Sequence, residues 1–259
     1  MTDPRSPARL RRSLVLAFAL GGAFAAGGCD VSFAGAMPSG QVQGSGGIRQ
    51  EARPVGRFDG VALSLPGKVE VRNGNAESLS IETEANLLPL IETVVEDGTL
   101  HIRARKGTAI RTRHLKIAVS TRALARLSVG GSGSIDADQV RGERMQLDVG
   151  GSGAIAVGKI DGARLGVSLG GSGDVKAGAG SVRSLALSFG GSGNVDLGRV
   201  RVETADVNMA GSGDAALWVR DSLDINAVGS GDVAYYGDPR IDKTSIGSGS
   251  LRRLGSAPH

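Results

Sequence analysis

The second half of the chain repeats one pattern of hydrophobic and polar positions. In each repeat three apolar residues alternate with polar or small ones, as in Leu165, Val167 and Leu169, and a Gly-Ser-Gly tripeptide follows. Further alternating apolar positions, such as Val175 and Ala177, come after the tripeptide. Alternation with a period of two is typical of a strand that buries one face. Each repeat therefore predicts two short strands, one on each side of a glycine-rich corner.

The spacing of the tripeptide predicts how these strands are arranged. In the second half of the chain Gly-Ser-Gly occurs seven times, with four intervals of 20 residues followed by two of 18. The copies begin at Gly131, Gly151, Gly171, Gly191, Gly211, Gly229 and Gly247. So short and regular a period is typical of a chain that coils and passes the same corner once per turn. We expect a right-handed parallel β-solenoid of about seven short turns, with neighbouring strands about 4.8 Å apart.

The residues between about 58 and 124 predict strands of a less regular kind. Short alternating runs are separated there by turn sequences, and Asp97-Gly98 is typical of a tight hairpin. Residues 86–92 have room for only a short helical turn, which Pro89 limits. An N-terminal β segment that leans antiparallel should therefore precede the repeat region, 124–250.

Composition and charge narrow the class of protein. The chain has 42 glycines but only five Phe, two Tyr and one Trp, which suits a thin aliphatic stack better than a globular core. Its net charge of +4 lies mostly in residues 1–28, which carry four arginines against one aspartate. The remainder has 26 basic and 25 acidic residues, without a basic run interleaved with aromatics. We therefore expect no nucleic-acid partner.

The N-terminus predicts export. Arg9, Arg11 and Arg12 precede an apolar stretch, residues 13–26, which has the length of a signal-peptide core and is short for a membrane span. Residues 1–28 are therefore a predicted signal peptide. Cys29, the one cysteine of the chain, follows directly in a sequence that resembles a bacterial lipobox. We expect it to carry a lipid that anchors the protein to a membrane of the bacterial envelope, on its periplasmic or outer face.

A second mode of export stays open at this point. Ala23-Phe24-Ala25 and Ala34-Gly35-Ala36 have the form that ordinary signal peptidase cleaves, and they would give a secreted protein without an anchor. Residues 29–55 are small and polar and predict a flexible tether. The expected organisation is thus a signal peptide (1–28), a tether (29–55) and a solenoid domain (56–259).

Three sequence features together are similar to a known bacterial family. They are Asn86-Leu87-Leu88-Pro89-Leu90-Ile91, Asp97-Gly98-Thr99-Leu100-His101-Ile102, and the serial Gly-Ser-Gly corners followed by Val or Ile. The combination resembles the family described as "putative auto-transporter adhesin, head GIN domain", formerly a domain of unknown function, over about residues 56–250. The resemblance implies an all-β, solenoid-like envelope domain, often behind a signal or lipoprotein leader.

Four polar residues occupy the same place after consecutive corners. They are Asp174, Asn194, Asp214 and Asp232. Like charges stacked about 5 Å apart repel one another unless water or a cation compensates them. A calcium ladder is one hypothesis, although the spacing is not that of nine-residue calcium repeats. Solvated carboxylates without a metal are the reading we favour.

Two aromatic residues align on adjacent turns near the end of the repeats. Trp218 and Tyr236 each follow an inward-facing position, so both should point outward and stack on each other. Exposed stacked aromatics are typical of sugar-binding surfaces. They also shield the last turns of a solenoid, and we favour this second role.

Catalysis has little support in the sequence. His101 and His114 lie on expected surface strands, and no metal-ligand spacing or nucleophile elbow is present. We expect a non-catalytic envelope protein without a cofactor, which serves adhesion or scaffolding and binds a glycan or another envelope component. The alternative is a carbohydrate-active β-helix enzyme that acts on acidic polysaccharide through carboxylates such as Asp174 and Asp214. Exposed strand edges at the ends of the rod also predict self-association.

Overall fold

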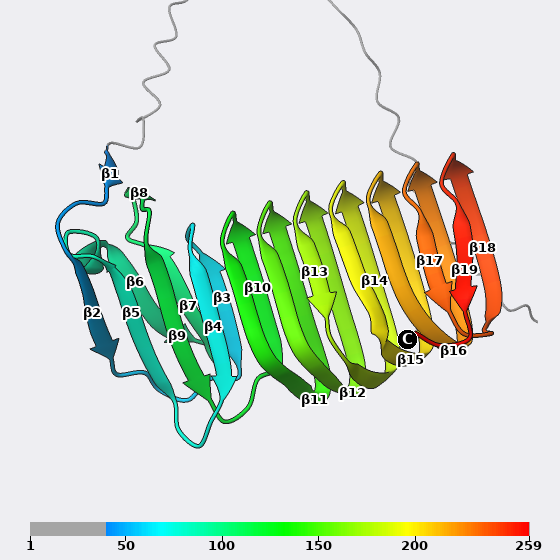
Figure 1. The fold of residues 1–259 in the computed structure, drawn as a ribbon, viewed down its shortest axis with the longest axis horizontal. Helices are drawn as coiled ribbons and strands as arrows, with labels where there is room; N and C mark the ends of the chain where they lie inside the picture. The colour runs from blue at the N-terminus through cyan, green and yellow to red at the C-terminus, as the bar shows by residue number, and fades with distance from the viewer. Residues whose placement is uncertain (1–39, 259) are drawn as a thin grey trace, which may run out of the picture. The chain divides into compact units, whose positions relative to one another are not determined.

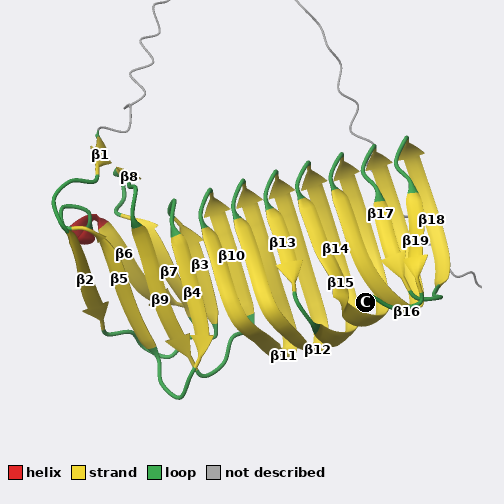
Figure 2. Cartoon of the chain, in the orientation of Figure 1, coloured by secondary structure: helices red, strands yellow, loops and turns green. Residues whose placement is uncertain are grey.

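A computed structural model describes residues 40–258 of the chain (Figure 1). The predicted signal peptide (1–28), the predicted lipidation site Cys29 and the first part of the predicted tether lie outside the described residues. Nearly all the regular structure is β (Figure 2), and within the described residues no helix is long and apolar enough to cross a membrane. The elements are β1 (Gln41–Gln43), β2 (Ile48–Arg53), β3 (Gly60–Ser64), β4 (Lys68–Asn73), β5 (Ser78–Glu84), the 3-10 helix η1 (Leu88–Leu90), β6 (Ile91–Glu96), β7 (Thr99–Ala104), β8 (Ala109–Arg111), β9 (Leu115–Thr121), β10 (Arg126–Gly131), β11 (Ser134–Gly151), β12 (Ala154–Gly171), β13 (Asp174–Ala177), β14 (Gly180–Gly191), β15 (Asn194–Gly211), β16 (Asp214–Gly229), β17 (Val233–Tyr236), β18 (Arg240–Gly247) and β19 (Leu251–Gly255).

The repeats form a parallel β-solenoid, as predicted. Each turn pairs in parallel with the next at an offset of one repeat, for example Leu147 with Val167 and Val167 with Leu187. The strands form two rows that meet at the Gly-Ser-Gly corners, one row before the corner and one after it (Figure 1). The row before the corner runs from β10 through the second halves of β11 and β12 to β14 and on to β18. The row after the corner runs from the first half of β11 through β13 to β17 and β19.

The core is a set of aliphatic columns that run along the rod. The inward positions are buried in turn after turn, and each buried side chain stabilises the fold by about 1.5–3 kcal/mol. One column consists of Leu127, Leu147, Val167, Leu187, Val207 and Ile225, with exposed fractions of 0–2%. Such a narrow stack explains why the chain needs so few aromatic residues.

Most turns contain one long bent strand where we predicted two short ones. β11, β12 and β15 each continue through the bend opposite the corner, because a further apolar residue is buried there, such as Val140 or Ile160. The register between β11 and β12 continues across this bend as far as Gly142 and Gly162. Gly180 takes the place of Ile160 in the following turn, and there the strand breaks between β13 and β14. Gly180 still pairs with Ile160 and Val200, so the break is confined to the two residues between β13 and β14.

The coil begins before the first Gly-Ser-Gly corner. β3 pairs in parallel with β10, and β4 pairs in parallel with β11, so these two strands form an additional layer of the solenoid. Beyond this layer the pairs β2–β5, β5–β9 and β6–β7 are antiparallel, in agreement with the prediction for the N-terminal segment. The hairpin between β6 and β7 turns at Asp97 and Gly98, which have φ of 48° and 73°. The short helical turn expected in residues 86–92 is η1.

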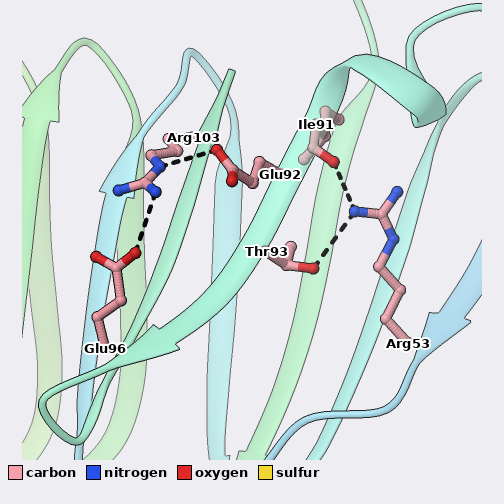
Figure 3. Close-up of polar contacts among 6 residues, drawn as sticks. All are labelled: Arg53, Ile91, Glu92, Thr93, Glu96 and Arg103. Atoms are coloured by element: carbon pink, nitrogen blue, oxygen red, sulfur yellow. Dashed lines mark hydrogen bonds and ion pairs between the residues drawn. The ribbon is translucent and has the colours of Figure 1, made fainter. Parts of the chain in front are cut away.

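Part of the expected tether belongs to the sheet. Within residues 29–55, β1 pairs with β8 and β2 pairs antiparallel with β5. Arg53 at the end of β2 holds this strand in place: its Nη1 donates to the Ile91 carbonyl at 2.6 Å and its Nη2 to the Leu88 carbonyl at 2.7 Å. Figure 3 shows Arg53 reaching Ile91 and Thr93 of β6. The polar composition of this segment concealed the strands because their stability comes from such contacts.

From the second Gly-Gly-Ser-Gly run onward, the backbone of the serine is fixed by the turn below it. The Ser192 N–H donates to the Gly171 carbonyl at 2.8 Å, while the serine side chain is exposed. Gly191 has φ of +135°, and a Cβ added there would lie 2.0 Å from the Gly171 carbonyl oxygen. Glycine is therefore required at this corner position both by conformation and by close backbone packing. The preceding Gly190 has no such restriction, since an added Cβ would meet nothing nearer than 4.0 Å.

We predict that the adjacent substitutions Gly191→Ala and Gly190→Ala have very different effects. Gly191→Ala should lower the free energy of unfolding by about 1–3 kcal/mol or more, because it strains φ and drives a methyl group into the turn below. Gly190→Ala should leave stability unchanged or raise it by about 0.5–1 kcal/mol. Urea unfolding followed by circular dichroism measures both. Equal effects would contradict this assignment of the two glycines.

A buried carboxylate ties together the N-terminal end of the solenoid. Glu84 is 7% exposed and accepts hydrogen bonds from the Thr112 hydroxyl at 2.6 Å, the Thr83 hydroxyl at 2.9 Å and the Arg113 N–H at 3.2 Å. Burial alone raises the pKa of this carboxyl, but the hydrogen bonds from Thr112, the backbone and Thr83 outweigh it and lower the pKa to about 2.

We predict that Glu84 makes stability depend on acid pH. Because its pKa in the folded protein lies below the unfolded value of 4.5, its contribution is complete above that pH and disappears as the pH falls towards about 2. Glu84→Ala should lower the free energy of unfolding at neutral pH by about 1–3 kcal/mol, since it leaves buried donors without an acceptor. The same substitution should also reduce the fall in the free energy of unfolding between these two pH values, as measured by denaturant unfolding. An unchanged decline in the variant would show that another group causes it.

Candidate functional site

A long open groove runs along the row of strands that precedes the corners. It has a volume of about 980 Å³ and crosses β10, β11, β12, β14, β15, β16 and β18 near their ends. Its floor consists of the outward-facing position directly before each corner glycine: Gly130, Gly150, Gly170, Gly190, Ala210, Val228 and Ile246. We call this groove the glycine trough. It exists because most of the floor positions carry no side chain or only a methyl group.

Neither packing nor backbone conformation requires the glycines of the trough. A Cβ added to Gly150 or Gly170 would meet no atom within 4 Å, and neither residue has a φ in the left-handed region. Glycine within a strand costs about 0.5–1 kcal/mol relative to alanine, so its presence in four successive turns lacks an internal reason. Unexplained glycine in a strand is typical of a place where a ligand or another backbone approaches closely.

The rim of the trough is polar and almost uncharged. Its residues are Ser128, Asp148, Ser168, Ser188, Asn208, Asn226 and Thr244. The Gln146 amide donates to Asp148 at 2.7 Å and to Ser168 at 3.3 Å, and the Asn226 amide donates to Asn208 at 3.3 Å. These contacts align the rim along the rod. The trough thus offers hydroxyl and amide groups at steps of about 4.8 Å beside an exposed backbone.

The predicted acidic column forms on the other row of strands. Asp174, Asn194, Asp214 and Asp232 are exposed, and each is the first residue of its strand or lies just before it. Asn194 donates to Asp174 through its backbone N–H at 3.2 Å and its amide at 2.9 Å. The Asp232 N–H donates to Asp214 at 3.0 Å. Each of these aspartates therefore binds the backbone of the next turn.

The last carboxylate of the column, like the first, has two donors in the next turn. Asp232 accepts hydrogen bonds from the Ser250 N–H and the Ser250 hydroxyl, both at 2.8 Å. These bonds hold the pKa of the Asp232 carboxyl below its ordinary value. Donors of the next turn thus compensate the stacked charges without a metal ion. No group of three or more His, Cys, Asp or Glu within residues 40–258 has the arrangement of a metal site, and calcium binding stays a hypothesis.

We predict that the column stabilises the rod locally and does not respond to calcium. Asp232→Ala should speed amide hydrogen exchange in β19, because the Ser250 N–H loses its acceptor. Asp206→Ala, a matched exposed aspartate on the other row, should leave the exchange of β19 unchanged. Melting curves should not move with millimolar calcium or a chelator. A calcium-dependent rise in melting temperature that Asp232→Ala removes would establish the calcium ladder instead.

The aromatic pair lies where the sequence predicted it. Trp218 and Tyr236 are register partners on adjacent turns, and both are half-buried. Each directly follows a buried residue, Leu217 or Tyr235, and therefore lies on the outer face of its strand. The Tyr236 ring lies over Gly198, with its Cε2 3.7 Å from the place where a Cβ of Gly198 would be. Covering the backbone in this way fits the shielding role. Sugar binding by this pair stays a hypothesis.

The Gly-Ser-Gly tripeptide predicted only a corner, and the glycine before it was not considered, so the trough was missed. The signal was present in the glycine that precedes each of the first four tripeptides. Of the histidines within residues 40–258, His101 lies on β7 and His114 directly precedes β9, both outside the trough. His114 contacts the carboxylate of Glu82 on the neighbouring strand β5.

Comparison with known proteins places the chain in a family. The family model described as "Putative auto-transporter adhesin, head GIN domain" matches residues 57–239. No curated protein matches the chain. Among solved structures, a "putative adhesin" from Bacteroides fragilis is 24% identical with a TM-score of 0.74, and the match covers 82% of this chain and 100% of that one.

Two structures from Parabacteroides are similar as well. A "putative lipid binding protein" from Parabacteroides distasonis is 27% identical with a TM-score of 0.66, covering 83% of this chain and 100% of that one. A "putative adhesin" from Parabacteroides merdae is 18% identical with a TM-score of 0.66, covering 83% and 99%. The likenesses below 25% identity support the fold alone.

Proposed function

The chain belongs to the auto-transporter adhesin head GIN domain family, and we propose that it is an exported, non-catalytic binding protein of the adhesin type. The glycine trough is its binding surface. The observation that carries this assignment is the column Gly130, Gly150, Gly170 and Gly190, which opens the backbone of four turns where neither packing nor φ requires it. The flat, repetitive face suits a ligand that is itself extended and repetitive.

The chemistry of the trough favours an extended, weakly charged polymer such as a glycan. Its rim presents hydroxyl and amide groups with a single carboxylate, Asp148, and its floor leaves backbone accessible. Repetition along the rod lets one chain make the same contact in several turns, which raises affinity without a deep pocket. A glycan or another component of the envelope is thus the partner that we propose.

We predict that filling the trough weakens binding. Gly170→Gln places a side chain on the floor where an added Cβ meets nothing, so the fold should be preserved. Binding on an array of bacterial and host glycans should weaken by about tenfold, which corresponds to 1.4 kcal/mol. Ala156→Gln, at an outward position of the same strand on the opposite row, is the matched control and should bind normally. Equal binding by both variants would reject the trough as the surface.

The proposal includes the leader predicted from the sequence. Residues 1–28 direct export, Cys29 carries the lipid, and a tether within residues 29–55 connects the anchor to the solenoid domain. Mass spectrometry of the mature N-terminus tests this part separately. A diacylglyceryl group on Cys29 supports the anchor. A free N-terminus at Met37 would show instead that the protein is secreted without a lipid anchor.

A carbohydrate-active enzyme is less well supported. The hollow beside Asp214 and Asp232 is small, about 230 Å³, and both carboxylates accept hydrogen bonds from the next turn. The lowered pKa of Asp232 is opposite to that of a general acid in a glycosidase. Turnover of an acidic polysaccharide that is lost in Asp214→Asn would establish the enzyme in place of the binding protein.

A further inference from the structure

The C-terminal end of the solenoid has a surface unlike the rest of the described chain. β18 pairs only with β16, and β19 pairs only with β17, so each leaves one edge without a partner in residues 40–258. All eight residues of β18 are exposed. This end is therefore accessible to a partner.

Exposed aliphatic side chains gather at this end. Five large hydrophobic residues are exposed in the described chain, and four of them belong to the last turns: Val228 at 56%, Ile241 at 38%, Ile246 at 70% and Leu254 at 36%. The fifth, Ile48 at 49%, lies on β2 near the other end. Single exposed apolar residues are ordinary, but a group of this kind marks an interaction surface.

Basic residues accompany the aliphatic ones. From residue 240 to the end, the chain carries Arg240, Lys243, Arg252 and Arg253 against one acidic residue, Asp242, a net +3. Residues 29–239 have 22 basic and 24 acidic residues, a net −2. Arg253 is held by the Gly237 carbonyl at 2.9 Å and by Asp238 at 2.8 Å, so Arg240, Lys243 and Arg252 are the main cations of this surface.

The position of two of these charges argues against another copy of the chain as the partner. Lys243 and Arg253 are in register with the buried Ile225 and Tyr235, so they occupy core positions at the end of the stack. Inward-pointing charges are a device by which natural proteins prevent edge-to-edge pairing. Two such ends would also bring like charges together. The surface is instead complementary to an anionic partner.

We propose that the C-terminal end of the solenoid docks on an anionic lipid surface. Basic side chains near such a surface are attracted to it, and each contributes about fivefold to affinity. Aliphatic side chains beside them bury themselves at the boundary of headgroups and acyl chains, which adds to the electrostatic attraction. The exposed aliphatic side chains favour lipid over an acidic polysaccharide as the partner, because a polysaccharide offers no apolar layer for Ile246 and Val228. Val228 and Ile246, the last two floor positions of the glycine trough, belong to this surface, whereas the four glycines of the trough do not.

The test uses the full chain with Cys29→Ser, so that no lipid anchor is present. Ser248→Cys then provides a single thiol for an environment-sensitive dye at the C-terminal end, and Asn75→Cys provides the matched label near the other end. Vesicles of phosphatidylcholine with phosphatidylglycerol should shift the emission of the dye at residue 248 and not at residue 75. This local readout separates the docking from any binding by residues 1–28.

Charge and apolar variants complete the test. Lys243→Glu with Arg252→Glu should weaken vesicle binding at least about 25-fold, at fivefold per charge removed, and added salt should weaken the unmodified chain. Ile246→Asp should weaken binding, while Ile48→Asp, the matched exposed isoleucine, should not. Gly170→Gln should leave vesicle binding intact, so failure of the trough proposal is distinguishable from failure of this one.

Four results would overturn the proposal. Equal binding to vesicles of phosphatidylcholine alone would show that anionic lipid is not required. Equal binding by the charge variant would show that the basic residues are not required. Binding to soluble alginate that depends on Lys243 and Arg252, without a dye shift on vesicles, would assign the surface to an acidic polysaccharide. Concentration-dependent dimers in analytical ultracentrifugation that Ile246→Asp abolishes would assign it to a second copy.

Discussion

The close contact between backbones at the corners is the constraint on which the rest of the structure depends. From Gly151 onward, each corner glycine lies almost directly on the backbone of the turn below, and the next N–H donates to the carbonyl of that turn, as Ser192 does to Gly171. This contact fixes the rise of the coil at one strand spacing and forces every turn into the same register. Identical register in turn places aliphatic residues in columns, so the thin core follows from the corner.

A stack of equal turns is simple in its middle and demanding at its ends, where no further turn covers the core. The N-terminal end is closed by antiparallel strands and by buried polar contacts, with Arg53 on the carbonyls of Leu88 and Ile91 and Glu84 among the donors of Thr83 and Thr112. The C-terminal end is closed by charge placed over the core columns, at Lys243 and Arg253. The two ends thus solve the same problem by different chemistry, and only the second leaves a basic, apolar surface exposed.

The parts of the fold that could be predicted from the sequence are those with a local or periodic cause. Alternation predicted the strands, the period predicted the parallel coil, and Asp97-Gly98 predicted the hairpin. The continuous strand at the bend was missed because Val140 and Ile160 were not recognised as an additional inward column. β2 was missed because its pairing depends on contacts with residues distant in sequence, such as those of Arg53. The glycine trough was missed because glycine has no side chain, so an outward glycine leaves no sign in the pattern of hydrophobic and polar positions.

Two glycines that are adjacent in the sequence thus have separate physical causes. Gly191 is required by the turn beneath it, and substitution there is resisted by the carbonyl of Gly171. Gly190 contacts nothing that would resist a side chain, and yet it lies in a column with Gly130, Gly150 and Gly170. A cost of about 0.5–1 kcal/mol in each of four turns has no benefit inside the molecule. The proposed binding surface supplies a reason outside the molecule: a ligand that approaches this face closely enough to touch the backbone.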